Sequence, residues 1–512
     1  MEHSRKLIYN TLALSIKILL TCIVQLIGTR IALSVLGDEA FGLYNLLAGL
    51  IILFSFVTGA LLISTQRYLS ISIGANDIIK LKSIFNVSLL IHIIITIFLT
   101  LLLISIKSFL FNDILNIGAQ YISTAKVMYN ILILSIIITI STIPYSAAIN
   151  AHEDMVYFAF TEIVSLAFKL LAAITLLYIK GDHLLIYTWL MLLAIAIGAL
   201  MKIVWCHIKY SESKLSIHTM VNKPLFNEMI GFVSWNTLGS ASVVIRNQGV
   251  AVLLNMFFGT VVNAAYGIAN QVNSLVLSFA STLTTVFTPS IVQNKGAGNE
   301  TRMLEIAIFS SKLSFCVSTI MALPILTYLN KVLIWWLKDI PTNTSAFVYW
   351  IVLSFLIQQL YPGINRAIYA SGKIKAYQIS ISLILIAIIP IGYTLLKLGL
   401  EPKWIIIALF ILQCFTLMST IYYAQKECGL NSKEFYIKSV LYPIAVFSLL
   451  LLLSQIIDEK IYPTTSQDIS SILFISFIEI VLYVLLYFKV VFNKAEKQQL
   501  LKLVNKIKFK SL

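Results

Sequence analysis

Long apolar runs, separated by short polar breaks, follow one another along the whole chain. Residues 88–106 are interrupted only by His92 and a few hydroxyl side chains, and residues 440–457 contain no charge. Each run is long enough to cross about 30 Å of hydrocarbon as an α-helix. Strands of a membrane β-barrel would be short and would alternate in polarity, whereas these runs are continuous and rich in Leu and Ile. The pattern therefore predicts membrane-spanning helices.

Counting the runs between polar breaks predicts about fourteen transmembrane helices. The predicted spans are 9–35, 41–64, 83–107, 120–148, 155–179, 183–206, 228–257, 262–290, 305–337, 345–369, 376–397, 403–425, 437–457 and 469–491. The connections are mostly short, so the sequence offers no separate soluble domain for an active site. We predict an all-α polytopic membrane protein whose functional residues lie within the helical bundle.

The composition supports a membrane protein. The 512 residues are 59% hydrophobic and 12% charged, and the mean hydropathy is +0.92. A soluble protein is closer to half apolar and a quarter charged. The five cysteines show no paired spacing, which argues against a disulfide or metal framework. The first apolar run is too long for a signal peptide and contains Lys17, so we expect an uncleaved first helix.

The formal net charge is +15, which in a soluble chain would suggest nucleic acid as a partner. Here the charges lie mainly between the apolar runs, and roughly two dozen cations fall in alternate loops against about seven in the others. The basic loops carry Arg67, Lys80, Lys82, Lys209, Lys214, Lys223, Lys295, Arg302, Arg366, Lys373, Lys375, Lys426, Lys433 and Lys438. The bias predicts that both termini are cytoplasmic and excludes nucleic acid as the expected partner. The lysine-rich tail 493–512 is either a basic helix on the anionic leaflet or a solvated end.

An internal repeat organises the chain. A shift of 222 residues places Gly37 on Gly259 and Tyr44 on Tyr266, and a shift of 219 places 148–151 on 367–370. The repeat predicts two six-helix halves of equal orientation, 1–222 and 223–435, followed by two added helices, 436–492, and the tail, 493–512. Parallel repeats of this kind are typical of alternating-access transporters, with a cavity between the halves.

Three stretches carry a resemblance to a known family: "RIALSVLGDEAFGLYNLLAG" (30–49), "GFVSWNTLGS" (231–240) and "FFGTVVNAAYGIANQV" (257–272). With six plus six plus two helices, the chain resembles the polysaccharide flippase branch (O-antigen and capsule flippases) of the multidrug/oligosaccharidyl-lipid/polysaccharide exporter superfamily. The resemblance covers about residues 1–440. The drug-exporting branch often carries an ion-coupling Asp in its first helix, and the span 9–35 has no carboxylate.

The resemblance implies a flippase of the bacterial inner membrane that carries a polyprenyl-diphosphate-linked oligosaccharide to the outer leaflet for lipopolysaccharide or other surface polysaccharide. Its partners would be that lipid, membrane lipids, and the polymerase and glycosyltransferases of the same pathway. Two alternatives stay open: a cation-coupled multidrug exporter of the same superfamily, and a membrane glycosyltransferase or polysaccharide polymerase. No catalytic constellation, metal-binding motif, ATP-binding motif or cofactor-binding motif is present, so we predict neither an enzyme nor a cofactor.

Polar side chains follow helical spacing inside several predicted spans. Lys17 and Gln25 share one face of the first span, and the span 262–290 carries a wide stripe of amide and hydroxyl groups. Such groups at bilayer depth usually face partners, water or substrate. The predicted substrate-binding residues are Lys17, Gln25, Arg30, Tyr44, Lys169, Asn236, Arg246, Asn247, Asn263, Tyr266 and Asn270.

Two interpretations of these residues stay open. In the first, Lys17, Arg30, Lys169 and Arg246 supply positive charge for a diphosphate, while amides and Tyr266 meet sugar hydroxyls. In the second, the polar groups hold helices together. The second interpretation includes an internal Glu162–Lys169 pair and a structural Glu479.

Overall fold

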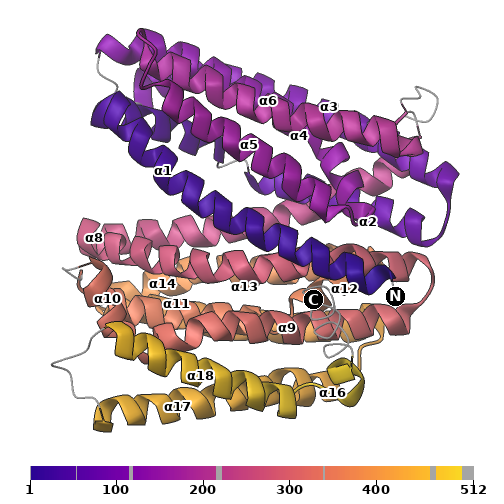
Figure 1. The fold of residues 1–512 in the computed structure, drawn as a ribbon, viewed down its shortest axis with the longest axis vertical. Helices are drawn as coiled ribbons and strands as arrows, with labels where there is room; N and C mark the ends of the chain where they lie inside the picture. The colour runs from indigo at the N-terminus through magenta and orange to yellow at the C-terminus, as the bar shows by residue number, and fades with distance from the viewer. Residues whose placement is uncertain are drawn as a thin grey trace, which may run out of the picture. The chain divides into compact units, whose positions relative to one another are not determined.

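The computed structural model describes residues 2–52, 55–114, 119–214, 222–337, 341–461 and 469–498, and every regular element in these ranges is helical (Figure 1). The α-helices are α1 (Glu2–Ile52), α2 (Ser55–Gly74), α3 (Ile78–Phe109), α4 (Ile122–Ala151), α5 (Met155–Thr175), α6 (His183–Lys209), α8 (Lys223–Gly296), α9 (Glu300–Thr327), α10 (Leu329–Leu337), α11 (Thr344–Gln358), α12 (Pro362–Ser371), α13 (Lys375–Ile386), α14 (Ile388–Lys397), α15 (Lys403–Cys428), α16 (Ser432–Phe435), α17 (Tyr442–Ile461) and α18 (Ile469–Val490). The predicted all-α class is confirmed.

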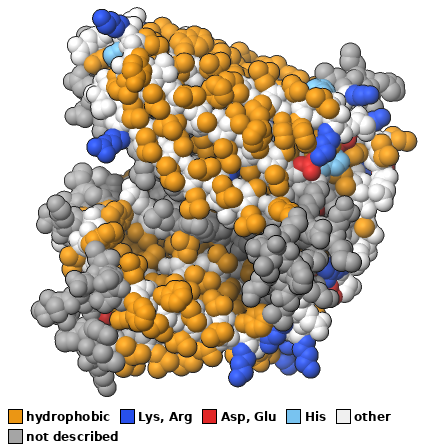
Figure 2. Space-filling view, in the orientation of Figure 1, with side chains coloured by type: hydrophobic (Ala, Val, Ile, Leu, Met, Phe, Trp, Pro, Cys, Tyr) orange, Lys and Arg blue, Asp and Glu red, His pale blue; other side chains and the backbone are white. Residues whose placement is uncertain are grey.

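Ten helices in the described part of the chain are long and apolar enough to cross a membrane. The bent pair α11 and α12, which meet at 45°, raises the number to eleven if the pair forms one span. On the face shown in Figure 2, hydrophobic side chains cover the helices and most lysines and arginines lie toward the helix ends. The predicted spans 9–35, 41–64 and 262–290 are helical where described but are not among the ten, so the count of fourteen is not confirmed.

The chain forms two compact units, Tyr9–Ser240 and Ala241–Leu512 together with Met1–Ile8. In the first unit α4 packs against α2, α3, α5 and α6, which run alongside it in Figure 1. In the second unit α9 packs against α12, α17 and α18, and α15 packs against α11 to α14. The predicted boundaries at 222/223, 435/436 and 492/493 remain predictions.

The repeated sequence elements have the same backbone conformation in both units. Gly37 breaks α1 with φ 73° and ψ 170°, and Gly259 breaks α8 with φ 77° and ψ −165°. Residues at equivalent later positions also have positive φ: Asn76 with Gly298, Glu153 with Gly372, and Gly181 with Gly399. Asp77 and Asn299, again 222 residues apart, cap the next helix through a side-chain oxygen that accepts a backbone N–H. The duplication thus extends to the turns as well as to the helices.

We expect Gly37→Ala and Gly259→Ala each to destabilise the protein by about 1–3 kcal/mol. Positive φ with extended ψ is essentially restricted to glycine, because a Cβ clashes with the backbone there. The measurement is thermal unfolding of purified protein in detergent. Gly231→Ala in α8 is the matched control, since a Cβ there has open space and φ is ordinary. Equal melting temperatures for all three variants would contradict the expectation.

Arg67 departs from the sequence prediction because its helix continues where the pattern indicated a loop. Arg67 was expected in a basic loop, but α2 runs on to Gly74 and leaves Arg67 only 7% exposed. Its guanidinium carbon lies 4.7 Å from the ring centroids of Tyr68 and Phe232. The two prolines near the repeated stretches 148–151 and 367–370 differ in their setting: Pro144 lies inside the continuous α4, and Pro362 begins α12 after the bend.

Helix α12 lies unusually close to α9 at Gly363. The Gly363 backbone N–H donates a hydrogen bond of 3.0 Å to the Ser311 hydroxyl oxygen of α9. A Cβ on Gly363 would lie 2.0 Å from the Ala307 carbonyl oxygen. Ala307 and Ser311 are small residues four apart, as are Gly363 and Ala367. Small residues at this spacing let two helix backbones approach closely in a membrane.

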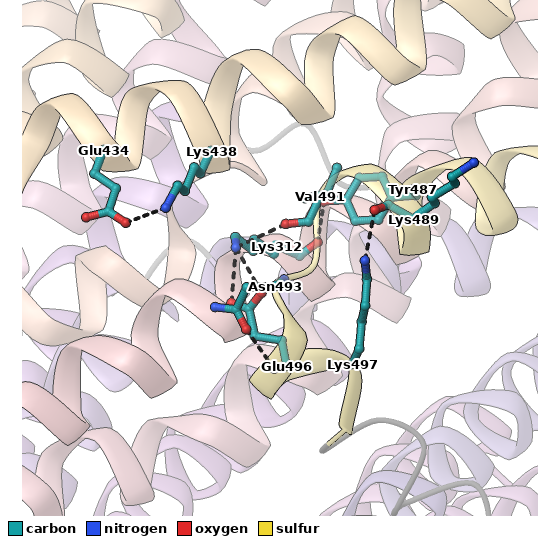
Figure 3. Close-up of polar contacts among 9 residues, drawn as sticks. All are labelled: Lys312, Glu434, Lys438, Tyr487, Lys489, Val491, Asn493, Glu496 and Lys497. Carbon is teal, nitrogen blue, oxygen red and sulfur yellow. Dashed lines mark hydrogen bonds and ion pairs between the residues drawn. The ribbon is translucent and has the colours of Figure 1, made fainter.

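A buried ion pair ties the end of α18 to α9 (Figure 3). The Lys312 ammonium lies 3.0 Å from both carboxylate oxygens of Glu496 and 3.2 Å from the Val491 carbonyl oxygen. Tyr487 donates a hydrogen bond of 2.8 Å to the Lys312 carbonyl oxygen. The Asn493 backbone N–H donates a hydrogen bond of 2.7 Å to the Glu496 carboxylate, and the Glu496 backbone N–H donates one of 2.8 Å to the Asn493 amide oxygen. The first turn of the tail is therefore held inside the second unit.

Candidate functional site

The first unit contains a cationic cluster between α1, α5 and α6. The Lys202 ammonium of α6 lies 2.6 Å from a carboxylate oxygen of Glu162 in α5 and 4.9 Å from the Phe158 ring centroid. The Lys17 ammonium of α1 lies over the same ring at 5.6 Å. Lys17 and Lys169 both act electrostatically on Glu162. We call these five residues the lysine cluster.

The charge of the lysine cluster does not balance. Three ammonium groups act electrostatically on one carboxylate, and the carboxylate forms its ion pair with Lys202. The alternative pair of Glu162 with Lys169 is therefore wrong for this structure. Coulombic attraction for an anion is strong where solvent screening is weak. The lysine cluster therefore contains two more cationic groups than anionic groups.

The remaining predicted residues of the first unit lie elsewhere. Arg30 is exposed. Tyr44 packs edge-on against Tyr187, with ring centroids 4.9 Å apart, in a mainly apolar cluster. Asn236 is buried and donates a hydrogen bond of 3.1 Å to the Ala60 carbonyl oxygen, so it links α8 to α2. Gln25 lies in α1, and its side chain falls outside what the structure describes.

The second unit contains an arginine and tyrosine cluster. The Arg246 Nε donates a hydrogen bond of 3.1 Å to the Asn247 amide oxygen. Arg246 also lies within electrostatic range of Tyr266 and Tyr361. Tyr361, at the bend before α12, accepts a hydrogen bond from Gln413 of α15. Helices α8, α12 and α15 thus bring a cation, two phenols and amides together.

The same pattern continues along α12. The Arg366 guanidinium carbon lies 5.8 Å from the Tyr369 ring centroid, and Gln378 donates a hydrogen bond of 3.0 Å to the Tyr369 hydroxyl. Among the described residues, neither Arg246 nor Arg366 forms an ion pair with a carboxylate. This unit therefore also presents unneutralised positive charge among aromatic and amide groups.

The predicted stripe of α8 is described in part. Tyr266 is buried, and the Asn270 amide donates a hydrogen bond of 3.0 Å to the Tyr266 carbonyl oxygen. The buried amide oxygen of Asn273 has no hydrogen-bond partner in the described part of the chain. Asn263 is helical, and its side chain is not described. An amide with free hydrogen-bonding capacity fits a surface that meets polar ligand atoms.

Sequence reasoning missed Lys202, Tyr361 and Gln413 and placed Arg366 among the cytoplasmic loops. Lys202 lies near one end of its predicted span, 183–206, where a snorkelling lysine is common. Its partner Glu162 is forty residues away in the sequence, so no helical spacing connects the two. One signal was available: both groups lie inside apolar runs, where a cation and a carboxylate tend to pair.

The comparisons with known proteins identify the fold. Residues 237–394 match the MatE family model. No curated protein sequence matches the chain. A MATE protein in the bent conformation has 13% identity and a TM-score of 0.73, with 85% of this chain and 98% of that chain covered. An outward-facing multidrug resistance MATE family transporter of the MOP superfamily has 12% identity and a TM-score of 0.69, with 87% and 96% covered.

A MOP superfamily transporter from Pyrococcus furiosus is similar to the same extent, with 13% identity, a TM-score of 0.72, and 83% and 96% of the two chains covered. Its structure is described as having a binding pocket of reverse polarity that suggests a different function. The chain is thus a polytopic membrane protein with the MATE transporter fold. These matches do not separate the polysaccharide branch of the superfamily from the drug-exporting branch.

Proposed function

We propose that the protein is a flippase that moves a polyprenyl-diphosphate-linked oligosaccharide from the inner to the outer leaflet by alternating access of two six-helix halves. The observation that carries this proposal is the lysine cluster, in which Lys17, Lys169 and Lys202 all act on the single carboxylate of Glu162. A site with more cations than carboxylates favours an anionic ligand. The diphosphate of a lipid-linked sugar is such a ligand.

Each part of the proposed site has a chemical role. The ammonium groups of the lysine cluster bind the diphosphate oxygens as point charges, and Glu162 neutralises Lys202 when the lipid is absent. Arg246 offers a guanidinium, which binds phosphate in a bidentate manner. The amide groups of Asn247 and Asn270 and the phenols of Tyr266 and Tyr361 suit the hydroxyl groups of a glycan.

A cation-coupled multidrug exporter is the second candidate. The likeness to a structure described as a multidrug resistance transporter supports it, and so does Glu162, a carboxylate at membrane depth. The two functions need opposite charges from the lysine cluster. A flippase needs the lysines, whereas an exporter of cations needs the carboxylate.

We expect Lys202→Gln and Arg246→Ala each to slow flipping about ten- to a hundredfold, because a hydrogen bond between charged groups contributes roughly 1.5–3 kcal/mol. The measurement uses proteoliposomes that contain a fluorescent polyprenyl-diphosphate disaccharide, with quenching of the outer leaflet. The exposed Lys180, in the loop before α6, gives the matched control Lys180→Gln.

Glu162→Gln separates the two candidates. If the protein is a flippase, the Glu162→Gln variant retains more flipping activity than the Lys202→Gln variant, because all three lysines of the lysine cluster remain. For an exporter of cationic dyes it abolishes efflux while Lys202→Gln does not. Normal flipping by folded Lys202→Gln and Arg246→Ala proteins would show that the proposed site is wrong.

A further inference from the structure

Glu479 occupies a buried position in the middle of α18, where it faces α9 and α17. The residue is 5% exposed. Its Oε1 atom lies 2.8 Å from the Thr327 hydroxyl oxygen of α9, and Ser454 of α17 is its other polar neighbour. Its Oε2 atom is buried and has no hydrogen-bond partner among the described residues. The lysine cluster and the arginine and tyrosine cluster make no use of it.

The hydrogen bonds around Thr327 indicate which atom carries the proton. The Thr327 hydroxyl oxygen lies 3.0 Å from the Leu323 carbonyl oxygen. A carbonyl has no hydrogen, so Thr327 is the donor in that bond, and a hydroxyl has only one hydrogen to give. When Thr327 gives its hydrogen to the Leu323 carbonyl, the 2.8 Å contact with Glu479 is favourable only if the carboxyl group carries a hydrogen and donates it to the Thr327 oxygen. The arrangement fits a neutral carboxylic acid.

The charged groups on the surrounding helices are engaged with each other. On one side Lys331 of α10 pairs with Asp458 of α17 at 2.5 Å. On the other side Lys312 of α9 pairs with Glu496 of the tail. Among the described residues, the other titratable groups that face this seam are Cys316 of α9 and Tyr483 and Tyr487 of α18. None of these groups is a cation, so within the part of the chain that the structure describes an ionised Glu479 would be a buried charge without a counterion, which is strongly unfavourable.

We propose that Glu479 is a proton-binding site that locks α18 to α9. While the proton is bound, the carboxyl group donates to Thr327 and the two helices stay packed. When the O–H bond breaks, the proton goes to water and the electron pair stays on the carboxylate. The charge then has to reach solvent, so α18 separates from α9. The packing of the α17–α18 pair on the second unit thereby responds to pH.

Cys316 gives a native reporter of this separation. It is 8% exposed and lies on α9 eleven residues before Thr327, which places both on the same face of the helix. Cys206, a fully buried thiol in the other unit, serves as the internal reference. The experiment uses the full-length protein in lipid nanodiscs, alkylation with N-ethylmaleimide at a series of pH values, and mass spectrometry of both cysteines.

In the wild type we expect the ratio of Cys316 alkylation to Cys206 alkylation to rise with pH. Below the pKa of Glu479 the ratio should rise about tenfold per pH unit, because the deprotonated fraction of Glu479 rises by the same factor. Glu479→Gln keeps a neutral group in place, and we expect its ratio to stay flat. A flat ratio in the wild type, or an equal rise in both proteins, would overturn the proposal.

Infrared difference spectroscopy tests protonation itself. The wild-type spectrum at neutral pH minus that of Glu479→Gln should contain the carbonyl band of a protonated carboxyl group. A carboxylate band in its place would also overturn the proposal. Neither measurement depends on which substrate the protein transports.

Discussion

We expect Lys312→Met to lower the free energy of unfolding by about 3–5 kcal/mol, since removing one partner of a buried ion pair leaves the other charge unpaired. The side chains of Lys312 and Glu496 are 4% and 10% exposed, so water does not replace the lost partner. The measurement is thermal unfolding in detergent, read by a thiol-independent signal such as light scattering or circular dichroism.

The same region provides a matched control. Lys438 and Glu434 form an ion pair at 2.7 Å in which both side chains are more than half exposed (Figure 3). Exposed pairs contribute little to stability, so Lys438→Met should leave the melting temperature almost unchanged. The double variant Lys312→Met with Glu496→Leu should recover much of the loss, because neither charge remains buried. A Lys312→Met protein as stable as the wild type would show that the ion pair does not hold the tail.

The second large effect is expected at Gly363. Gly363→Ala introduces a Cβ at 2.0 Å from the Ala307 carbonyl oxygen and 2.9 Å from the carbonyl carbon, both of which are backbone atoms. A rotamer change cannot relieve that contact, so α12 has to move away from α9. We expect a loss of about 3 kcal/mol or more in stability, at the upper end of the range for overpacked cores.

Melting temperature and yield of monodisperse protein measure the effect of Gly363→Ala. Gly267→Ala in α8 is the control, because a Cβ there meets no atom within 4 Å. Ser311→Ala gives a comparison of a different kind, since it removes only the hydrogen bond to the Gly363 N–H. We expect it to have a smaller effect than Gly363→Ala. If the three variants have the same melting temperature, the close approach of α9 and α12 is not important for stability.

The features that could be predicted from the sequence are those set by local physics. Apolar runs gave the helices, and the pairing of Gly37 with Gly259 located two breaks that the structure places at those residues. The comparisons confirm the fold class, but they leave the polysaccharide branch as a proposal. Helix ends were less predictable, as Arg67 shows. An arginine after an apolar run looks like a loop residue, yet it is buried between aromatic rings.

The candidate site could be predicted only in part, because it depends on contacts between helices that are distant in sequence. Lys17 and Lys169 were found as single cations at membrane depth, and the structure brings both to Glu162. The ion pair with Lys202 required the packing of α5 against α6. Tyr44 and Asn236 have the right chemistry, but the structure uses them for packing and for a bond between helices.

The close approach of α12 to α9 also has a mechanical consequence. Two backbones in direct contact leave no layer of adaptable side chains between them, so the helices cannot slide past each other without breaking the contact. The bend of 45° between α11 and α12 lies immediately before this contact. Within the second unit, the bend therefore separates α11 from the part of the chain in which α9 and α12 meet backbone to backbone.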